Sequence, residues 1–166
     1  MTEESLISSI KDAAKRNFSI SLSGIHGVAH WDRVHENAVY LAKHTRADTA
    51  VVRSFAYLHD CCRQSDGSDP DHGLRAADFA LSLRPTILNL TDEQFELLHL
   101  ACRDHEKGRT SEDPTIGSCW DADRLDLGRV GIKPRTSYLS TAKAQTTAVR
   151  EWGYKRSRGH KATLNG

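Results

Sequence analysis

The sequence lacks the features of membrane, secreted and disulfide-stabilised proteins. Its apolar runs are only a few residues long, too short for a transmembrane helix. The first ten residues, MTEESLISSI, begin acidic and have no long apolar core, so we do not expect a signal peptide. None of the four cysteines forms a C-x-x-C pair, and we expect reduced thiols in a cytoplasmic protein.

An excess of charge of either sign is also missing. The formal net charge is +1 with neutral histidines. A balance this even favours neither nucleic acid nor a membrane as a partner. We expect a monomer or homodimer. With 166 residues, 38% of them hydrophobic, the chain is large enough and apolar enough for one domain with a buried core.

Period-two alternation of apolar residues, which marks a half-buried β-strand, is not found either. Apolar residues instead recur at helical spacing, and Thr91 with Gln94 has the pattern of a capping box. The segments expected to be helical are 3–17, 28–43, 48–60, 72–83, 91–105, 119–127 and 140–152, with a loop at 107–117. We therefore predict an all-α fold, a compact bundle of about six or seven helices in residues 1–152, followed by a flexible basic tail at 153–166.

Histidine, in contrast, is abundant, with nine residues in the chain. It is the commonest metal ligand in proteins and the usual acid or base near neutral pH. Histidines and aspartates lie at or near the ends of several predicted helices: His30, His59-Asp60, His72, His105 and Asp123. Because helix ends of an all-α domain can converge on one pocket, we predict that these residues form a single site.

The doublet His59-Asp60, with His30 before it and Asp123 after it, has the chemistry of a metal site. Two neutral imidazoles and two carboxylates suit Mn²⁺, Fe²⁺, Co²⁺, Ni²⁺ or Zn²⁺ and leave coordination positions open for water or a phosphate oxygen. Such an ion polarises a phosphoryl oxygen and lowers the pKa of its water, which favours hydrolysis. We predict one or two divalent transition-metal ions here.

Three neighbouring residues compete with these assignments. His26 lies four residues before His30 and could share its helix face, although we expect it in the preceding loop or the first turn of the helix. Asp121 and Asp123 would point about 200° apart on a helix, so they cannot both face one ion. Asp126 lies three residues after Asp123 and could face the same ion.

The segments AHWDRV, AYLHD and DADRLD resemble the H…HD…D signature of the HD superfamily of metal-dependent phosphohydrolases. The resemblance implies an HD-type helical fold with its core at about 24–132. It favours Asp123 over the neighbouring aspartates. The metal ligands that it implies are His30, His59, Asp60 and Asp123.

Some members of this superfamily have the longer pattern H…HD…H…H…D, in which two further histidines bind a second metal or contact substrate phosphate. His72 and His105 resemble these histidines. The implied activity is hydrolysis of a small phosphorylated metabolite or nucleotide, a phosphomonoester or phosphodiester, by a metal-activated water. Two alternatives stay open: an HD-type mixed-valent diiron oxygenase, and a non-catalytic metal- or nucleotide-binding sensor domain.

Basic residues beside the motif are candidates for binding substrate phosphate, because arginine can hold phosphate through paired hydrogen bonds. They are Arg63, Arg33, Lys107 and Arg124. Arg63 is the best candidate because it follows the doublet directly, whereas surface salt bridges compete for the other arginines. Related nucleotide hydrolases often carry an acid shortly after the doublet. Here Cys-Cys-Arg-Gln follows and the nearest acid is Asp66, so no substrate is inferred from those members.

Overall fold

The chain folds into helices joined by loops. The computed structural model describes residues 2–165, and within them there is no β-strand. The helices of this range are α1 (Glu3–Asn17), α2 (Val28–Ala42), α3 (Thr49–Leu58), α4 (His72–Leu83), α5 (Asp92–Asp104), α6 (Pro114–Arg124), η1 (Leu127–Val130), η2 (Thr136–Tyr138), α7 (Ala142–Gln145) and α8 (Thr147–Ser157), where η marks a 3₁₀ helix. The predicted all-α fold is confirmed. No helix in residues 2–165 is long and apolar enough to cross a membrane.

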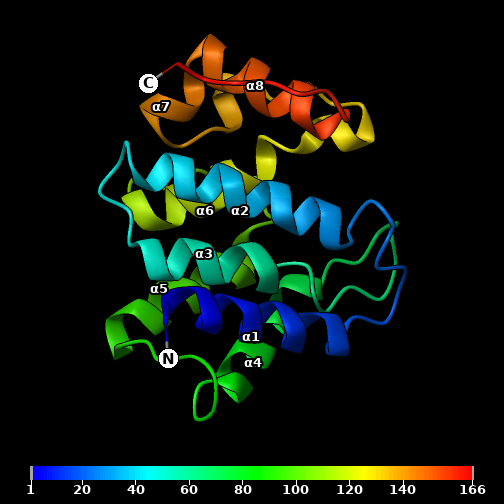
Figure 1. Cartoon of the computed structure of the whole chain (residues 1–166), viewed down its shortest axis with the longest axis vertical. Coiled ribbons are helices and arrows are strands. Elements are labelled where there is room, and N and C mark those ends of the chain that lie inside the picture. Colours follow the sequence, from blue (N-terminus) through cyan, green and yellow to red (C-terminus); the bar gives the residue numbers. More distant parts are fainter. Residues whose placement is uncertain (1, 166) are drawn as a thin grey trace.

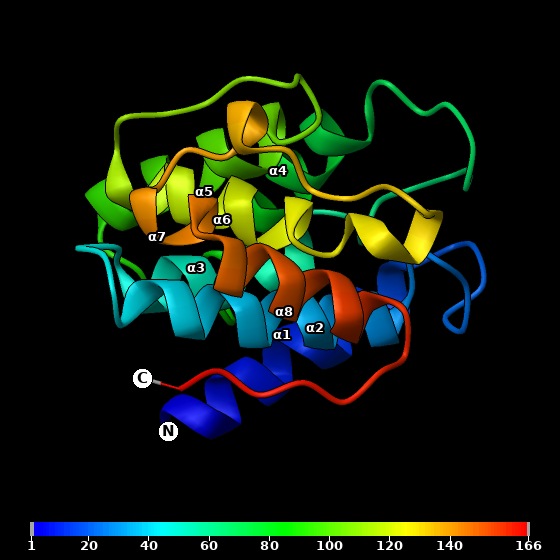
Figure 2. The ribbon, with the colours of Figure 1, turned by 90° about the horizontal axis from the view of Figure 1, so that it is seen from above.

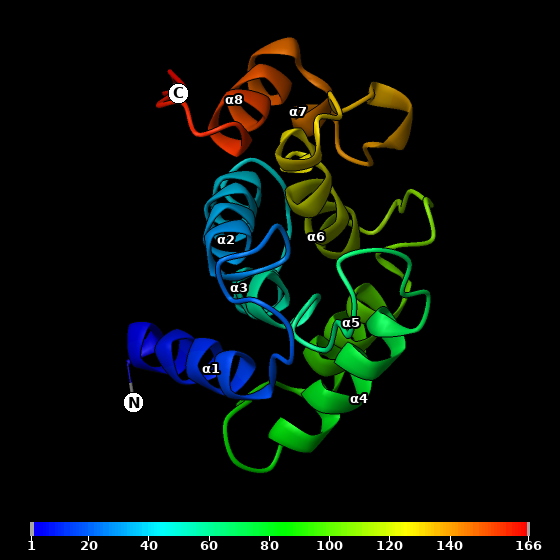
Figure 3. The same cartoon turned by 90° about the vertical axis from the view of Figure 1, so that its right-hand side faces the viewer.

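Helix α3 is the central element of the bundle. It contacts α1, α2, α4, α5 and α6, and Figure 3 shows it between α1, α2 and α5. Its apolar side chains on several faces, including Val51, Val52, Phe55 and Leu58, are fully buried. A helix that is apolar around its circumference is expected in the interior of a domain. The residues that directly follow α3 therefore lie in the middle of the molecule.

The other helices lie on both sides of this centre. Figure 1 shows α7 and α8 at one end of the molecule, α1 and α4 at the other, and α2 and α6 between α3 and α8. Helix α8 contacts α2 and η1, while α4 packs mainly against α5. The C-terminal ends of α3, α5 and α6 and the N-terminal ends of α2 and α4 are thus brought close to one another.

The capping signals in the sequence place several helix starts correctly. Asp48 caps α3, because its Oδ1 accepts a hydrogen bond from Val51 N at 3.1 Å. The predicted capping box opens α5: Gln94 N donates to Thr91 Oγ1 at 3.2 Å, and Thr91 N donates to Gln94 Oε1 at 3.0 Å. Each pair satisfies main-chain groups that have no partner within the helix.

Helix α6 starts earlier than the sequence analysis predicted. The segment expected as a loop, 107–117, contains its first turn, which begins at Pro114. Asp113 caps this turn, since its Oδ1 accepts hydrogen bonds from Thr115 N and Ile116 N, both at 2.9 Å. Proline is favoured at the first helical position because its missing N–H would have no partner there.

The C-terminal region differs from the prediction in two ways. The last predicted helix is divided into α7 and α8 at Thr146, which is extended and caps α8. Helix α8 then continues past the expected boundary at residue 152, to Ser157. Its last turns are held by Arg156, whose Nη1 donates to Asn37 Oδ1 at 2.6 Å. Figures 1 and 2 show the following segment running back along α8, where Leu164 packs against the core.

Candidate metal centre

The four ligands expected from the H…HD…D pattern meet in the interior. His30 comes from the first turn of α2, His59 and Asp60 directly follow α3, and Asp123 lies near the end of α6. The Nε2 atoms of His30 and His59 are 3.1 Å apart. Asp60 Oδ2 lies 3.3 and 3.4 Å from these two nitrogens, and Asp123 Oδ1 lies 3.4 and 3.5 Å from them. The sequence prediction that these residues lie together is confirmed.

A second group of ligands faces the other oxygen of Asp60. His72 begins α4 and His105 follows α5, and their Nε2 atoms are 2.9 Å apart. Asp60 Oδ1 lies 3.1 Å from His72 Nε2 and 3.5 Å from His105 Nε2. The carboxylate of Asp60 therefore has one oxygen directed at each histidine pair, and the two groups of three side chains share this residue.

The proton positions on three of these histidines follow from their neighbours. In each, Nδ1 faces a main-chain carbonyl oxygen, which can only accept a hydrogen bond, so Nδ1 carries the proton. The acceptors are the carbonyls of Phe55 and Ala56 for His59, of Asp69 for His72 and of Cys102 for His105. When the rings are neutral, their Nε2 atoms therefore carry lone pairs that point into the site.

His30 is held in the same way by a carboxylate. Its Nδ1 lies 2.7 Å from Asp126 Oδ2. Arg33 in turn donates from Nε to Asp126 Oδ1 at 2.7 Å and from Nη2 to Oδ2 at 3.0 Å. This chain fixes the ring of His30 and leaves its Nε2 free to bind a metal, as a carboxylate behind a ligating histidine commonly does.

The residues of both groups fit divalent metal ions. With all four rings neutral, the two imidazole lone pairs of each histidine pair would lie only about 3 Å apart and would repel one another. Asp123 Oδ1 is buried and has no hydrogen-bond donor among residues 2–165. A cation placed within each group would compensate all of these atoms, and nitrogen and carboxylate oxygen are the donors that divalent transition metals prefer.

The electrostatics of the protein without metal also favour a bound cation. Burial lowers the pKa of His59, but the carboxylates of Asp60 and Asp123 outweigh burial and raise that pKa to about 10. Burial opposes ionisation of Asp60 and Asp123, yet the facing histidines hold both carboxyl pKa values well below their usual range. The site thus concentrates negative charge that attracts protons, or metal ions in their place.

The structure separates the competing residues. His26 lies in the loop before α2, as expected, and its Nδ1 is 2.7 Å from Asp66 Oδ1. Asp121 points away from the ligands and accepts hydrogen bonds from Ser140 N and Thr141 N at 2.7 and 2.8 Å. Asp126, the open alternative to Asp123, instead supports His30.

The four basic candidates occupy different positions. Arg63 lies beside the doublet, and its Nε donates to Asp60 Oδ1 at 3.3 Å. Arg124 lines a pocket next to Asp123, whereas Arg33 is paired with Asp126. Lys107 donates to Asp104 Oδ1 at 2.8 Å. Substrate binding by these four residues stays a prediction.

Sequence reasoning missed the supporting groups. The carbonyl of Asp69 and the carboxylate of Glu106, whose Oε2 lies 3.0 Å from His72 Nδ1, are two examples. The aspartate that holds His30 was seen only as a rival ligand. A signal for its role was present, since Arg33 follows His30 by three residues on the same helix face and offers a partner for a buried carboxylate.

Comparisons with known proteins bear on the identity of this fold and centre. No protein-family model and no curated protein sequence matches the chain. Among solved structures, it is similar to the crystal structure of a predicted HD superfamily hydrolase from an uncultured Thermotogales bacterium. The TM-score is 0.68 at 25% identity, and the match covers 96% of this chain and 94% of the other. The helical fold and the ligand order agree with this similarity: the chain has the fold of an HD superfamily hydrolase, and its His/Asp cluster fits an HD-type metal site.

Proposed function

We propose that the chain is a metal-dependent phosphohydrolase that cleaves phosphate esters of a small metabolite or nucleotide. The observation that carries the proposal is the shared carboxylate of Asp60, which faces one histidine pair with each oxygen. Two divalent ions held in this way supply Lewis-acid polarisation of a phosphoryl oxygen and a lowered water pKa. The similarity to a predicted HD superfamily hydrolase supports a hydrolase in general.

The residues that would hold the ions are distinct from the residue that would bind phosphate. His30, His59 and Asp123 would hold one ion, and His72 with His105 would hold the other. Asp60 would serve both. Because the six side chains come from the ends of five helices, α3 and four helices that pack against it, their positions are set by the core.

Arg63 is the residue that we assign to substrate phosphate. Its Nε donates to Asp60, and its Nη1 donates to the carbonyls of Ser65 and Gly67 at 2.9 and 3.2 Å. Nη2 makes no hydrogen bond within residues 2–165, so one face of the guanidinium remains for a ligand. A fixed guanidinium beside the ions can stabilise the negative charge that develops on the phosphoryl group.

The test is a panel of phosphomonoesters and phosphodiesters assayed with Mn²⁺, Co²⁺, Ni²⁺ and Mg²⁺. We expect release of phosphate by the wild type and a loss of more than about 100-fold in Asp60→Ala, which removes a ligand of both ions. Metal analysis should show that Asp60→Ala binds less metal. Asp78→Ala, which changes an exposed aspartate on α4, is the control and should behave as the wild type. Full metal content and full activity in Asp60→Ala would refute the proposal.

A second candidate, an HD-type diiron oxygenase, is favoured by one observation. Such an enzyme needs His72 and His105 as ligands, and both lie against Asp60. It predicts bound iron and activity that is lost without O₂. Metal-dependent phosphate release under anaerobic conditions would rule out this candidate as the main activity. Tight nucleotide binding without turnover of any ester would instead indicate a sensor domain.

A further inference from the structure

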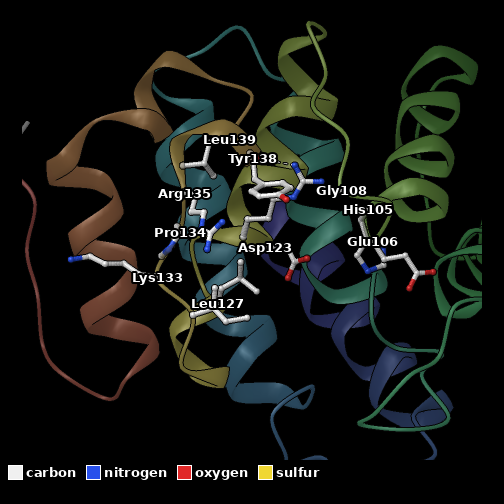
Figure 4. A pocket seen from close by; sticks show the side chains of 12 residues that line it. His105, Glu106, Gly108, Asp123, Leu127, Lys133, Pro134, Arg135, Tyr138 and Leu139 are labelled. Carbon is white, nitrogen blue, oxygen red and sulfur yellow. Dashed lines mark hydrogen bonds between the residues drawn. The ribbon is translucent and has the colours of Figure 1, made fainter.

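A pocket of about 480 Å³ opens directly beside the metal centre. Asp123 and His105 form one wall, and the segment 132–139, which follows η1, forms the opposite wall (Figure 4). This is the size of a small-ligand pocket in other proteins. A substrate whose phosphate lies at the metal centre would extend its remaining part into this space.

The segment 132–139 is fastened to α6 at its end, so the pocket is formed before a ligand arrives. Asp121 accepts hydrogen bonds from the main chain of Ser140 and Thr141 at 2.7 and 2.8 Å. Arg124 Nη1 donates to the carbonyl of Tyr138 at 2.6 Å. A preformed pocket loses less conformational entropy on binding.

The charges around the pocket are arranged unevenly. On the metal side, Asp123 faces His30 and His59, as described above, and Glu106 Oε2 lies 3.0 Å from His72 Nδ1. On the other side, Arg135 is exposed and has no ion pair or side-chain hydrogen bond within residues 2–165. Arg124 is buried, and its Nη2 has no partner in the same range. Arg135 thus brings to the far side a positive charge with no carboxylate bound to it, whereas the charge of Arg124 interacts with Asp123 and Asp121 on its own helix.

Lys133, although it also lines the pocket, belongs to a different group of contacts. Its Nζ lies 2.6 Å from Glu151 Oε1 on α8 and over the ring of Tyr154. Figure 4 shows its side chain extending away from Asp123. The charge of Lys133 is therefore already paired with Glu151. Substitution of Lys133 offers a matched control for substitution of Arg135 in the same segment.

We propose that this pocket receives the leaving group of the substrate and that the leaving group carries a second anionic group, a phosphate or a carboxylate. Arg135 binds that group. The apolar side chains of Leu127, Ile132 and Leu139 contact the body of the molecule between its two anionic groups. This inference rests on the proposed phosphohydrolase function and narrows its substrates to phosphate esters that carry a second anionic group, here called doubly anionic esters.

The kinetic test uses pairs of esters that differ in the second anionic group. Adenosine 5′-monophosphate is compared with adenosine 3′,5′-bisphosphate, and glycerol 1-phosphate with 3-phosphoglycerate. We expect the wild type to prefer the doubly anionic member of at least one pair by about 10-fold in kcat/KM, which also shows whether phosphate or carboxylate is recognised. Arg135→Ala should lower that preference about 10-fold, Arg135→Lys should restore part of it, and Lys133→Ala should retain it. An equal preference in wild type and Arg135→Ala would overturn the inference.

A binding measurement separates this inference from the proposed activity. Calorimetric titration of the chelator-treated protein with the same four compounds requires no turnover. Binding of a doubly anionic compound that Arg135→Ala weakens about 10-fold, with Lys133→Ala unaffected, supports the pocket assignment even if no ester is hydrolysed. Hydrolysis of both members of each pair at equal efficiency, with equal binding, leaves the phosphohydrolase in place and refutes the second anionic group.

Discussion

At the scale of single residues, the four histidines share one device: an acceptor behind Nδ1 that leaves Nε2 free to bind a metal. For three of these histidines the acceptors are main-chain carbonyls, and for His30 the acceptor is Asp126. The ligands themselves could be predicted because the spacing of His30, the doublet and Asp123 resembles a known signature. The acceptors could not, because a carbonyl carries no sequence signal and the role of Asp126 depends on how α2 and α6 pack.

Asp126→Asn should weaken metal binding by about 10- to 100-fold. The amide can still accept a hydrogen bond from His30 Nδ1, but it lacks the charge that makes the imidazole a strong ligand and that pairs with Arg33. Titration with Mn²⁺ against a fluorescent chelator measures the change. Asp78→Asn serves as the exposed control, and an Asp126→Asn affinity equal to that of the wild type would contradict the assigned role.

The affinity for metal should rise with pH. The pKa of His59 is raised to about 10, so at neutral pH the metal-free site holds a proton that a metal ion must displace. That proton stabilises the metal-free folded protein below the ordinary histidine pKa, and this stabilisation is lost as the pH rises through the raised pKa of His59. Metal binding has the opposite pH dependence, because it requires the deprotonated ring. We expect roughly a 10-fold gain in Mn²⁺ affinity per pH unit for each proton displaced, between pH 6 and pH 8. A pH-independent affinity would show that the ligands are already deprotonated.

At the scale of elements, apolar periodicity and capping residues predicted α1, α2, α4 and α5 within a residue or two of their ends. The start of α6 was missed because Ile116 is the one large apolar residue between Pro114 and Cys119, so no helical periodicity is visible before Cys119. The break at Thr146 was missed for a related reason. No glycine or proline marks it, and only the extended backbone of this capping residue separates α7 from α8.

Gly73 tests how the packing of two helices sets the metal centre. A Cβ at this position would lie 2.7 and 2.8 Å from the carbonyl oxygens of Cys102 and Arg103, so α4 and α5 can approach this closely only with glycine. Gly73 is next to His72, and the carbonyl of Cys102 orients His105. We expect Gly73→Ala to destabilise the protein by about 1–3 kcal/mol, which lowers Tm by roughly 3–10 °C.

The same variant should bind less metal at the His72–His105 pair than at the His30–His59 pair. Metal analysis and thermal unfolding check both expectations. Gly67→Ala is the control, because a Cβ there meets only Ser65 Oγ at 3.4 Å. If Gly73→Ala kept the stability and metal content of the wild type, the close contact between the helices would not control the site.

At the scale of the whole molecule, the centre joins helices that are far apart in sequence. Its six ligands come from the ends of α2, α3, α4, α5 and α6, which are packed around the buried α3. Periodicity can find such helices, but it cannot say which ends meet. In the sequence analysis, convergence followed from the family resemblance and a general rule about helix ends, whereas the pocket wall at 132–139 had no sequence signal.

Removal of metal should therefore destabilise the entire domain. Ions that bind only the folded chain at about 100 times their dissociation constant add about 2.7 kcal/mol per site. For a chain of this length, chelation should lower Tm by roughly 5–10 °C per ion, and added Mn²⁺ should restore it. Differential scanning calorimetry measures the shift. Asp60→Ala supplies the comparison, because the Tm of this variant should respond little to chelator. A wild-type Tm that does not change with chelator would contradict the expectation that bound ions hold the helices together.

The shared carboxylate of Asp60 also has an evolutionary consequence. In the proposed two-ion centre, loss of His72 or His105 by a single substitution would leave His30, His59, Asp60 and Asp123 intact, so a lineage could pass to a one-ion centre in small steps. Loss of Asp60 would remove a ligand of both ions at once. Homologues that keep only one of the two ligand groups should therefore lack the histidines of α4 and α5 and retain the doublet that follows α3.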